Sequence, residues 1–145
     1  MSWEPFAAVI GAYVVIGVFV MITFTMAYKL MGPDGAFRPG TYEVTLSWNL
    51  VSLVLGLPAA VLGGWVCVQI DDAPWTGRSL MILIVVLGLL DVAATVKKAR
   101  TESPARGEDV DNRTAMSHAR KPIWVAVANI GVGVVGVAAV VYGQA

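Results

Sequence analysis

The sequence has little charge and almost no cysteine or histidine. Only 14% of its 145 residues are Asp, Glu, Lys or Arg, whereas a soluble domain carries about a quarter. The single cysteine, Cys67, excludes an internal disulfide, a CxxC redox pair and a cysteine metal cluster. It either packs as a small residue or bridges to another chain. The single histidine, His118, has no second histidine or thiol near it in the sequence, so we expect no metal site and no histidine-held haem.

Hydrophobic residues are abundant instead. They make up 57% of the chain, with a mean hydropathy of +0.73, and they gather in four runs that are long enough to cross a bilayer, which takes about 20 helical residues. A chain of 145 residues cannot bury four such runs within itself. We therefore predict an all-α integral membrane protein, a single membrane domain over 1–145 that forms an antiparallel bundle of four transmembrane helices. The predicted spans are about 6–30, 46–70, 79–97 and 122–143.

The positive charges are divided unequally between the two ends of these spans. Of the ten Lys and Arg residues, only Arg78 falls in the connecting loop 71–78 or near a terminus. The others lie in or beside the loops 31–45 and 97–121. Because Lys and Arg in short loops mark the cytoplasmic face, we predict that these two loops are cytoplasmic and that both termini are non-cytoplasmic. The general style of the sequence is that of small bacterial inner-membrane proteins, so we expect the inner (plasma) membrane. The first run is expected to be a retained span, because its leader has no positive charge.

The loops carry distinct local signals. The loop 31–45 predicts turns at Pro33–Gly35 and at Pro39–Gly40, followed by a short extended piece. The short loop 71–78 predicts that the second and third spans are antiparallel neighbours. The polar loop 97–121 has two interpretations: a solvated connector whose cations hold anionic headgroups, or a docking site for a cytoplasmic partner.

Small residues recur every fourth position in the second predicted span. Hydrophobic burial does not drive helix association in lipid, so close backbone approach through small residues does. Pro58 removes one backbone hydrogen bond and is expected to bend this helix. The fourth span carries a matching series of small residues. The residues expected at helix contacts are Ser52, Gly56, Pro58, Ala60, Gly64, Gly133 and Gly136.

Polar residues inside the spans fall at one depth. At 1.5 Å per helical residue, Asp91 lies about two turns inside the cytoplasmic boundary, with Asn129 and Ser52 at a similar level and Asn49 and Lys29 shallower. An ionisable group within a span is costly and marks a functional site by default. Two interpretations stay open: a structural clamp of interhelical hydrogen bonds, or a ligand or ion site that opens to the cytoplasm. The candidate ligand-binding residues are Asp91, Asn129, Ser52, Asn49 and Lys29.

The sequence contains no recognisable set of nucleophile and base, metal ligands or phosphate-binding glycines. We therefore predict no catalytic residues, no cofactor and no nucleic-acid partner, and an enzyme is the less expected class. The leading hypothesis is a non-catalytic accessory subunit or homo-oligomer that acts by packing among membrane lipids, alone or in a larger membrane complex. The alternative is a carrier or binding protein for a small lipid-like or ionic ligand, with a cytoplasm-facing polar layer around Asp91.

Overall fold

Four long apolar helices dominate the computed structural model, which describes residues 3–143. The helices of this part of the chain are α1 (Glu4–Ala36), α2 (Leu46–Ile70), α3 (Pro74–Ala99), α4 (Asn112–His118) and α5 (Ile123–Gly143). All except the short α4 are long and apolar enough to cross a membrane. Residues 3–143 contain no β-strand, only isolated bridges. The prediction of an all-α membrane protein with four spanning helices is therefore confirmed.

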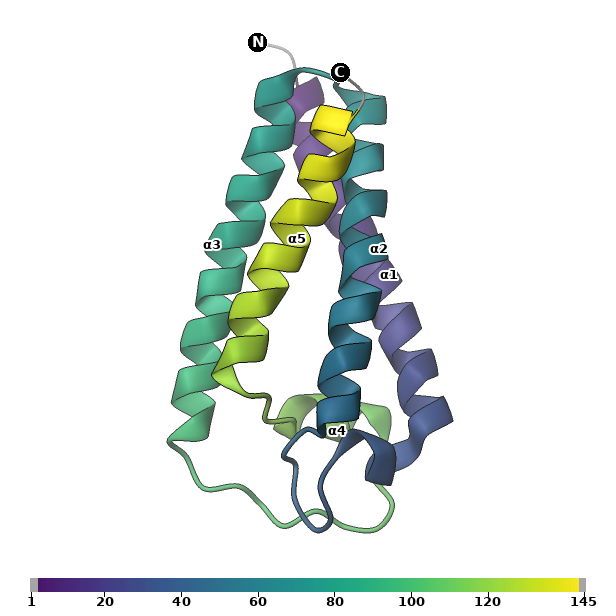
Figure 1. Cartoon of the computed structure of the whole chain (residues 1–145), viewed down its shortest axis with the longest axis vertical. Coiled ribbons are helices and arrows are strands. Elements are labelled where there is room, and N and C mark those ends of the chain that lie inside the picture. The colour runs from purple at the N-terminus through teal and green to yellow at the C-terminus, as the bar shows by residue number, and fades with distance from the viewer. Residues whose placement is uncertain (1–2, 144–145) are drawn as a thin grey trace.

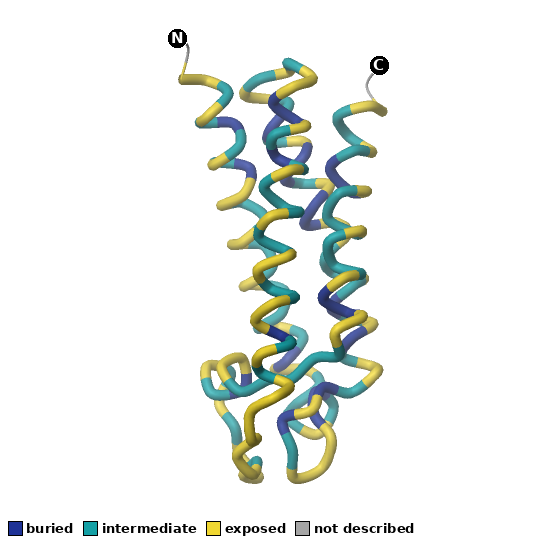
Figure 2. The backbone as a smooth tube through the Cα atoms, turned by 90° about the vertical axis from the view of Figure 1, so that its left-hand side faces the viewer, coloured by how far each residue is buried: buried dark blue, intermediate teal, exposed yellow. Residues whose placement is uncertain are grey.

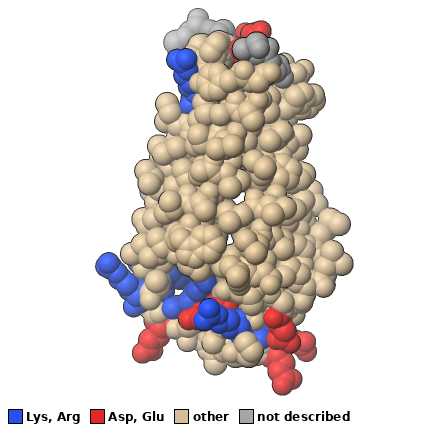
Figure 3. All heavy atoms as spheres, in the orientation of Figure 1, with Lys and Arg blue, Asp and Glu red and all other residues tan. Residues whose placement is uncertain are grey.

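The two ends of the bundle differ in what they carry. Both termini and the α2–α3 connection lie at one end, the termini end, while α4 and the two longer loops lie at the other, the loop end (Figure 1). Consecutive long helices therefore run antiparallel, as predicted. Lys and Arg side chains gather at the loop end, and large apolar side chains cover the wall between the two ends (Figure 3).

The order of the helices around the bundle is α1, α2, α5, α3. The largest contacts join α2 to α1 and to α5, and α5 to α3, whereas α2 and α3 touch over a small area only. In Figures 1 and 2, α2 and α3 stand at opposite corners. The sequence predicted them as neighbours. The three-residue link 71–73 nevertheless reaches across the diagonal. Four Cα steps cover about 14 Å, and neighbouring helix axes about 8–10 Å apart put the diagonal at about 11–14 Å.

Glycines bring the backbones of α2 and α5 together. A Cβ atom built on Gly136 would lie 2.6 Å from the Ala60 Cβ and 3.2 Å from the Leu57 carbonyl oxygen. A Cβ atom on Gly64 would lie 3.1 Å from the Val137 Cα. At both positions the nearest atoms include backbone atoms of the facing helix, and these cannot move aside as a flexible side chain can. The parallel neighbours α2 and α5 therefore meet main chain to main chain.

Other small residues serve different helix pairs. A Cβ atom on Gly63 would lie 2.3 Å from Ile16 Cγ1 and 3.3 Å from the Ala12 carbonyl oxygen, so this side of α2 faces α1. A Cβ atom on Gly133 would lie 2.8 Å from Ile84 Cγ2 of α3. The small residues of α2 and α5 therefore form more than one contact face each. One of the two buried clusters follows from these contacts, and its members are Ala8, Ala12, Ala60, Cys67, Leu80 and Val137.

The helix ends differ from the sequence-based expectation in places. α1 extends to Ala36 and is interrupted at Gly32, where φ is 68°, and Pro33–Gly35 forms a last helical turn instead of the expected turn between elements. The turn at Pro39–Gly40 is confirmed, with φ of 69° at its glycine. α3 starts at Pro74 rather than near residue 79, because proline suits the first helical position. α2 continues through Pro58 as one helix.

Two glycines of α5 allow a test of the α2–α5 contact. We expect Gly136→Ala to destabilise the bundle by about 1–3 kcal/mol, the usual effect of overpacking, because the new methyl group meets α2 backbone. Gly131→Ala is the matched control: no described heavy atom lies within 4 Å of a Cβ at that position, so we expect no loss of stability and a gain of up to about 1 kcal/mol, because alanine favours the helix more than glycine does. Unfolding by sodium dodecyl sulfate in mixed micelles measures both. Equal stability of the two variants would contradict the contact.

Candidate functional site

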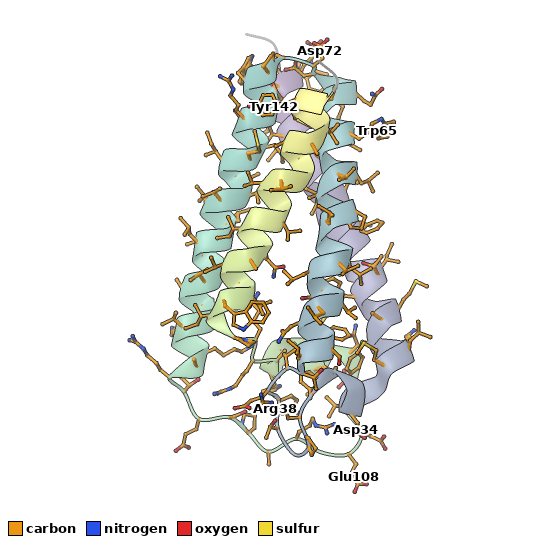
Figure 4. All side chains as sticks on the ribbon, viewed as in Figure 1. Asp34, Arg38, Trp65, Asp72, Glu108 and Tyr142 are labelled. Atoms are coloured by element: carbon orange, nitrogen blue, oxygen red, sulfur yellow. The ribbon has the colours of Figure 1, made fainter. Side chains whose placement is uncertain are left out.

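A pocket of about 530 Å³ opens between the four spanning helices at the loop end. All four helices contribute to it, and α4 and the segment that follows it form its floor. Apolar side chains line one part, including Phe24, Trp48, Ala94 and Val125. Polar side chains line another, including Asn49, Ser52, Asp91, Thr95 and Asn129. Figure 4 shows side chains from α2 and α5 projecting into this space, above Asp34 at the end of α1 and the loops that carry Arg38 and Glu108.

Four of the five predicted ligand-binding residues line this pocket. Asp91, Asn129, Ser52 and Asn49 come from three different helices and meet there. Lys29 does not: it is exposed on α1 and is not among the lining residues. Depth along the helix was predicted from the rise per residue, but the facing direction changes by about 100° from one residue to the next.

Asp91 forms an ion pair that the sequence did not reveal. Its Oδ2 lies 2.5 Å from Lys121 Nζ, at the start of the last span. The two side chains remain 46% and 30% exposed, so the pair adds little to stability. It does neutralise one charge at the edge of the pocket. Thirty residues separate the partners, so no local pattern could have indicated the pairing.

The asparagine amides of the polar layer remain available. Within residues 3–143, no hydrogen bond of Asn49 or Asn129 involves its side-chain amide. The Ser52 hydroxyl donates to the Asn49 carbonyl oxygen of its own helix, 2.7 Å away. A structural clamp needs hydrogen bonds between helices, and these three residues form none among the described residues. Their arrangement instead suits donors and acceptors for a bound molecule.

An aromatic cluster closes the loop end beside the pocket. It consists of Phe24, Tyr28, Phe37, Tyr42 and Trp48, whose neighbouring rings meet edge to face with centroids 5.7–6.3 Å apart. His118 of α4 extends it, with its ring 5.0 Å from that of Tyr42. The rings of this cluster pack against one another instead of lying singly at the surface. It therefore fixes the floor of the pocket.

The second half of the loop 97–121 folds onto this cluster. The Arg120 N–H donates to the Tyr42 carbonyl oxygen at 2.9 Å, and the Val44 N–H donates to the Arg120 carbonyl oxygen at 3.0 Å. Val110, Ala115 and Ala119 pack against the same cluster. A fully solvated connector does not describe this half of the loop. Its contacts, and those of Arg106 just before it, hold the segment 106–121 against the loop end of the bundle; we call this segment the cover.

Polar contacts tie the cover to α1. The Tyr28 hydroxyl donates to the Val110 carbonyl oxygen at 2.7 Å, and Asn112 Nδ2 donates to Thr25 Oγ1 at 3.0 Å. The hydroxyl of Thr25 on α1 is therefore a hydrogen-bond acceptor for the cover.

A buried arginine adds a charged contact to the cover. The Arg106 side chain is 5% exposed, and its Nη2 lies 2.7 Å from Asp34 Oδ1. At the start of α4, Asp111 accepts a hydrogen bond from the Thr114 N–H. Hydrogen bonds from Thr114, the side chain first and then the backbone, hold the pKa of Asp111 below its usual range.

The comparisons with known proteins add no assignment: no protein-family model, no curated protein and no solved structure matches the chain. The class of protein and the location of its candidate site are therefore derived from the structure of the chain itself. The fold is that of an integral membrane protein with four candidate spanning helices. The candidate site is the polar and cationic pocket at its loop end. Among residues 3–143 no group of three or more His, Cys, Asp or Glu is placed to hold a metal ion.

The cover can be tested through its hydrogen bond from Tyr28. We expect Tyr28→Phe to remove about 1 kcal/mol of local stability and to speed amide hydrogen exchange in Val110–His118 about fivefold. Tyr13→Phe serves as the control, because Tyr13 is 38% exposed on the same helix, away from the cover. Hydrogen exchange with mass spectrometry reports both. Unchanged exchange in Tyr28→Phe would mean that the bond does not hold the cover.

Proposed function

We propose that this protein binds a small lipid-like ligand in the loop-end pocket. One observation supports this most: apolar walls and uncommitted amides of Asn49 and Asn129 meet in a single cavity of about 530 Å³. Cavities of about 300–1,000 Å³ that combine apolar walls with a few polar groups are typical of small-molecule sites. A molecule with an apolar tail and a polar head matches both parts.

The route into the pocket supports a ligand that comes from the bilayer. α1 and α3 pack over a smaller area than the other neighbouring pairs. Small gaps are also visible above the charged loop end on the other face of the bundle, which α3, α5 and α2 form (Figure 3). A molecule dissolved in the hydrocarbon region could therefore enter sideways between helices.

The accessory-subunit hypothesis has less support. It rested on the abundance of small residues suited to helix contacts and on the absence of a recognisable set of catalytic, metal-binding or phosphate-binding residues, and some of the small faces were candidates for pairing with another subunit. In this fold Gly64 and Gly136 are used between α2 and α5, and Gly63 and Gly133 between other helices of the same chain. Contact with a second chain is therefore not needed to explain these small residues. Membrane lipids are therefore the partner that we propose.

We further propose that the loop end faces the cytoplasm of a bacterial inner membrane, with both termini outside. The support is the distribution of Lys and Arg, all of which except Arg78 lie at the loop end, and the tendency of such residues to stay cytoplasmic.

Cysteine labelling tests this orientation. In a Cys67→Ala background, we expect Asp72→Cys to react with a membrane-impermeant maleimide in intact cells. Gly107→Cys should react only after permeabilisation, because the loop 97–121 is proposed to be cytoplasmic. Gly107 lies in an exposed part of that loop, so the reagent can reach the new thiol once it is inside the cell. Equal labelling in permeabilised cells is the control. The opposite pattern in intact cells would reverse the proposed orientation.

Two adjacent alanines of α3 test the binding function. Ala94 lines the pocket and Ala93 does not, although both are exposed. We expect Ala94→Trp to fill the cavity and to abolish retention of lipid, because an indole occupies much of the space that a ligand needs. Ala93→Trp should retain lipid like the unmodified protein. Native mass spectrometry, after incubation with an extract of zwitterionic and anionic lipids, counts the bound molecules. Equal retention by both variants would refute the pocket as the site.

A further inference from the structure

The pocket carries an excess of positive charge. Four cationic side chains line it, from Lys97, Lys98, Arg120 and Lys121, against the single carboxylate of Asp91. That carboxylate is paired with Lys121. Within residues 3–143 no carboxylate forms an ion pair with the other three cations. The remaining charge at the pocket is therefore positive.

The contacts of two of these cations orient them without neutralising them. Lys98 Nζ donates to the Ala119 carbonyl oxygen at 3.0 Å. Arg120 Nη2 donates to the Thr101 carbonyl oxygen at 2.7 Å. Both acceptors are neutral, and each cation keeps further N–H donors for another acceptor. The cover thus holds an ammonium and a guanidinium at the mouth of the pocket.

We propose that Lys98 and Arg120, with Lys97 beside them, bind the anionic phosphate headgroup of an amphiphile. The inference rests on the proposed function and names the chemistry of its ligand. Arg and Lys are the side chains suited to phosphate, because their charged donors form short and strong hydrogen bonds to its oxygens. A zwitterionic headgroup would bring its own cation to the same cations and is disfavoured by repulsion.

The layers of the pocket match the parts of such a ligand in order. Along α3, Asp91 and Lys98 are seven residues apart, which is about 10 Å of helix. The cations therefore lie at the loop end, and the amide of Asn129, which lies at the depth of Asp91, is nearer the middle of the bundle. A phosphate at the cations and a polar linker at Asn129 would occupy these levels in sequence, with the acyl chain against the apolar part of the lining.

Binding of matched probes tests the proposal. The purified full chain in zwitterionic nanodiscs is titrated with monoacyl phosphatidylglycerol, monoacyl phosphatidylcholine and glycerol phosphate. We expect at least tenfold tighter binding of the phosphatidylglycerol than of the phosphatidylcholine. Glycerol phosphate, which has the anion and no tail, should bind at least a hundredfold more weakly. Equal affinity for glycerol phosphate and the anionic lipid would overturn a lipid headgroup as the source of the anion.

Charge-removing variants assign the effect to the named residues. Lys98→Gln with Arg120→Gln should abolish the preference for the anionic lipid and leave binding of the phosphatidylcholine within twofold, which also reports an intact pocket. The control removes two exposed cations of the same end that do not line the pocket, by Lys29→Gln with Arg113→Gln, and should keep the preference. Lys98→Arg should keep it as well.

The failures of the two proposals are distinguishable. Equal binding of both lipids by the unmodified protein would refute the anionic headgroup while leaving a lipid pocket. An equal loss of preference in the control variant would also refute it, because general attraction to a positive surface would then explain the selectivity. Binding of neither lipid would refute the proposed function itself.

Discussion

The close approach of the α2 and α5 backbones is the contact on which the rest of the structure depends. Lipid tails are as apolar as leucine, so helices in a bilayer associate through close packing rather than by hiding apolar surface. Gly64 and Gly136 allow that packing in the half of the bundle near the termini, where the buried cluster around Ala60 and Val137 also lies. At the loop end Asn49 and Asn129 lie on these same two helices and line a cavity instead. A tight half and an open half therefore follow from the placement of small and polar residues along two helices.

The loop end is held by a different kind of interaction. At that end, edge-to-face aromatic contacts and hydrogen bonds from the cover hold the helices together, in place of close helix–helix packing. Tyr28 joins both, because its ring packs in the cluster and its hydroxyl bonds the cover. The cover also contains Arg120 and Lys121, so the segment that closes the bundle supplies two of the four cations that line the pocket, while α3 supplies the other two. Structural and candidate binding roles are therefore combined in one segment.

Much of the polar layer was predictable from the sequence. Asp91 and Asn129 lie on helices whose limits follow from hydropathy, and a constant rise per residue places them at one depth. Lys29 shows the limit of that reasoning, because depth does not determine which way a side chain faces. Lys98 and Arg120 were grouped with cations that contact lipid headgroups outside the protein. Their place at the pocket depends on how the loop 97–121 folds back, through backbone contacts with Tyr42 and Val44 that have no local pattern.

The sequence by itself determined the number of spanning helices, their approximate limits and the depth of the polar residues. These properties depend on local composition and on fixed helix geometry, because the hydrocarbon region demands a continuous apolar helix of a certain length. Only the tertiary structure decided the order of the helices around the bundle, the pairing of Asp91 with Lys121 and the closing of the pocket by the cover. Those depend on which side chains meet across long stretches of sequence. A short link such as 71–73 is compatible with more than one arrangement, and only the fit of glycine against backbone selects among them.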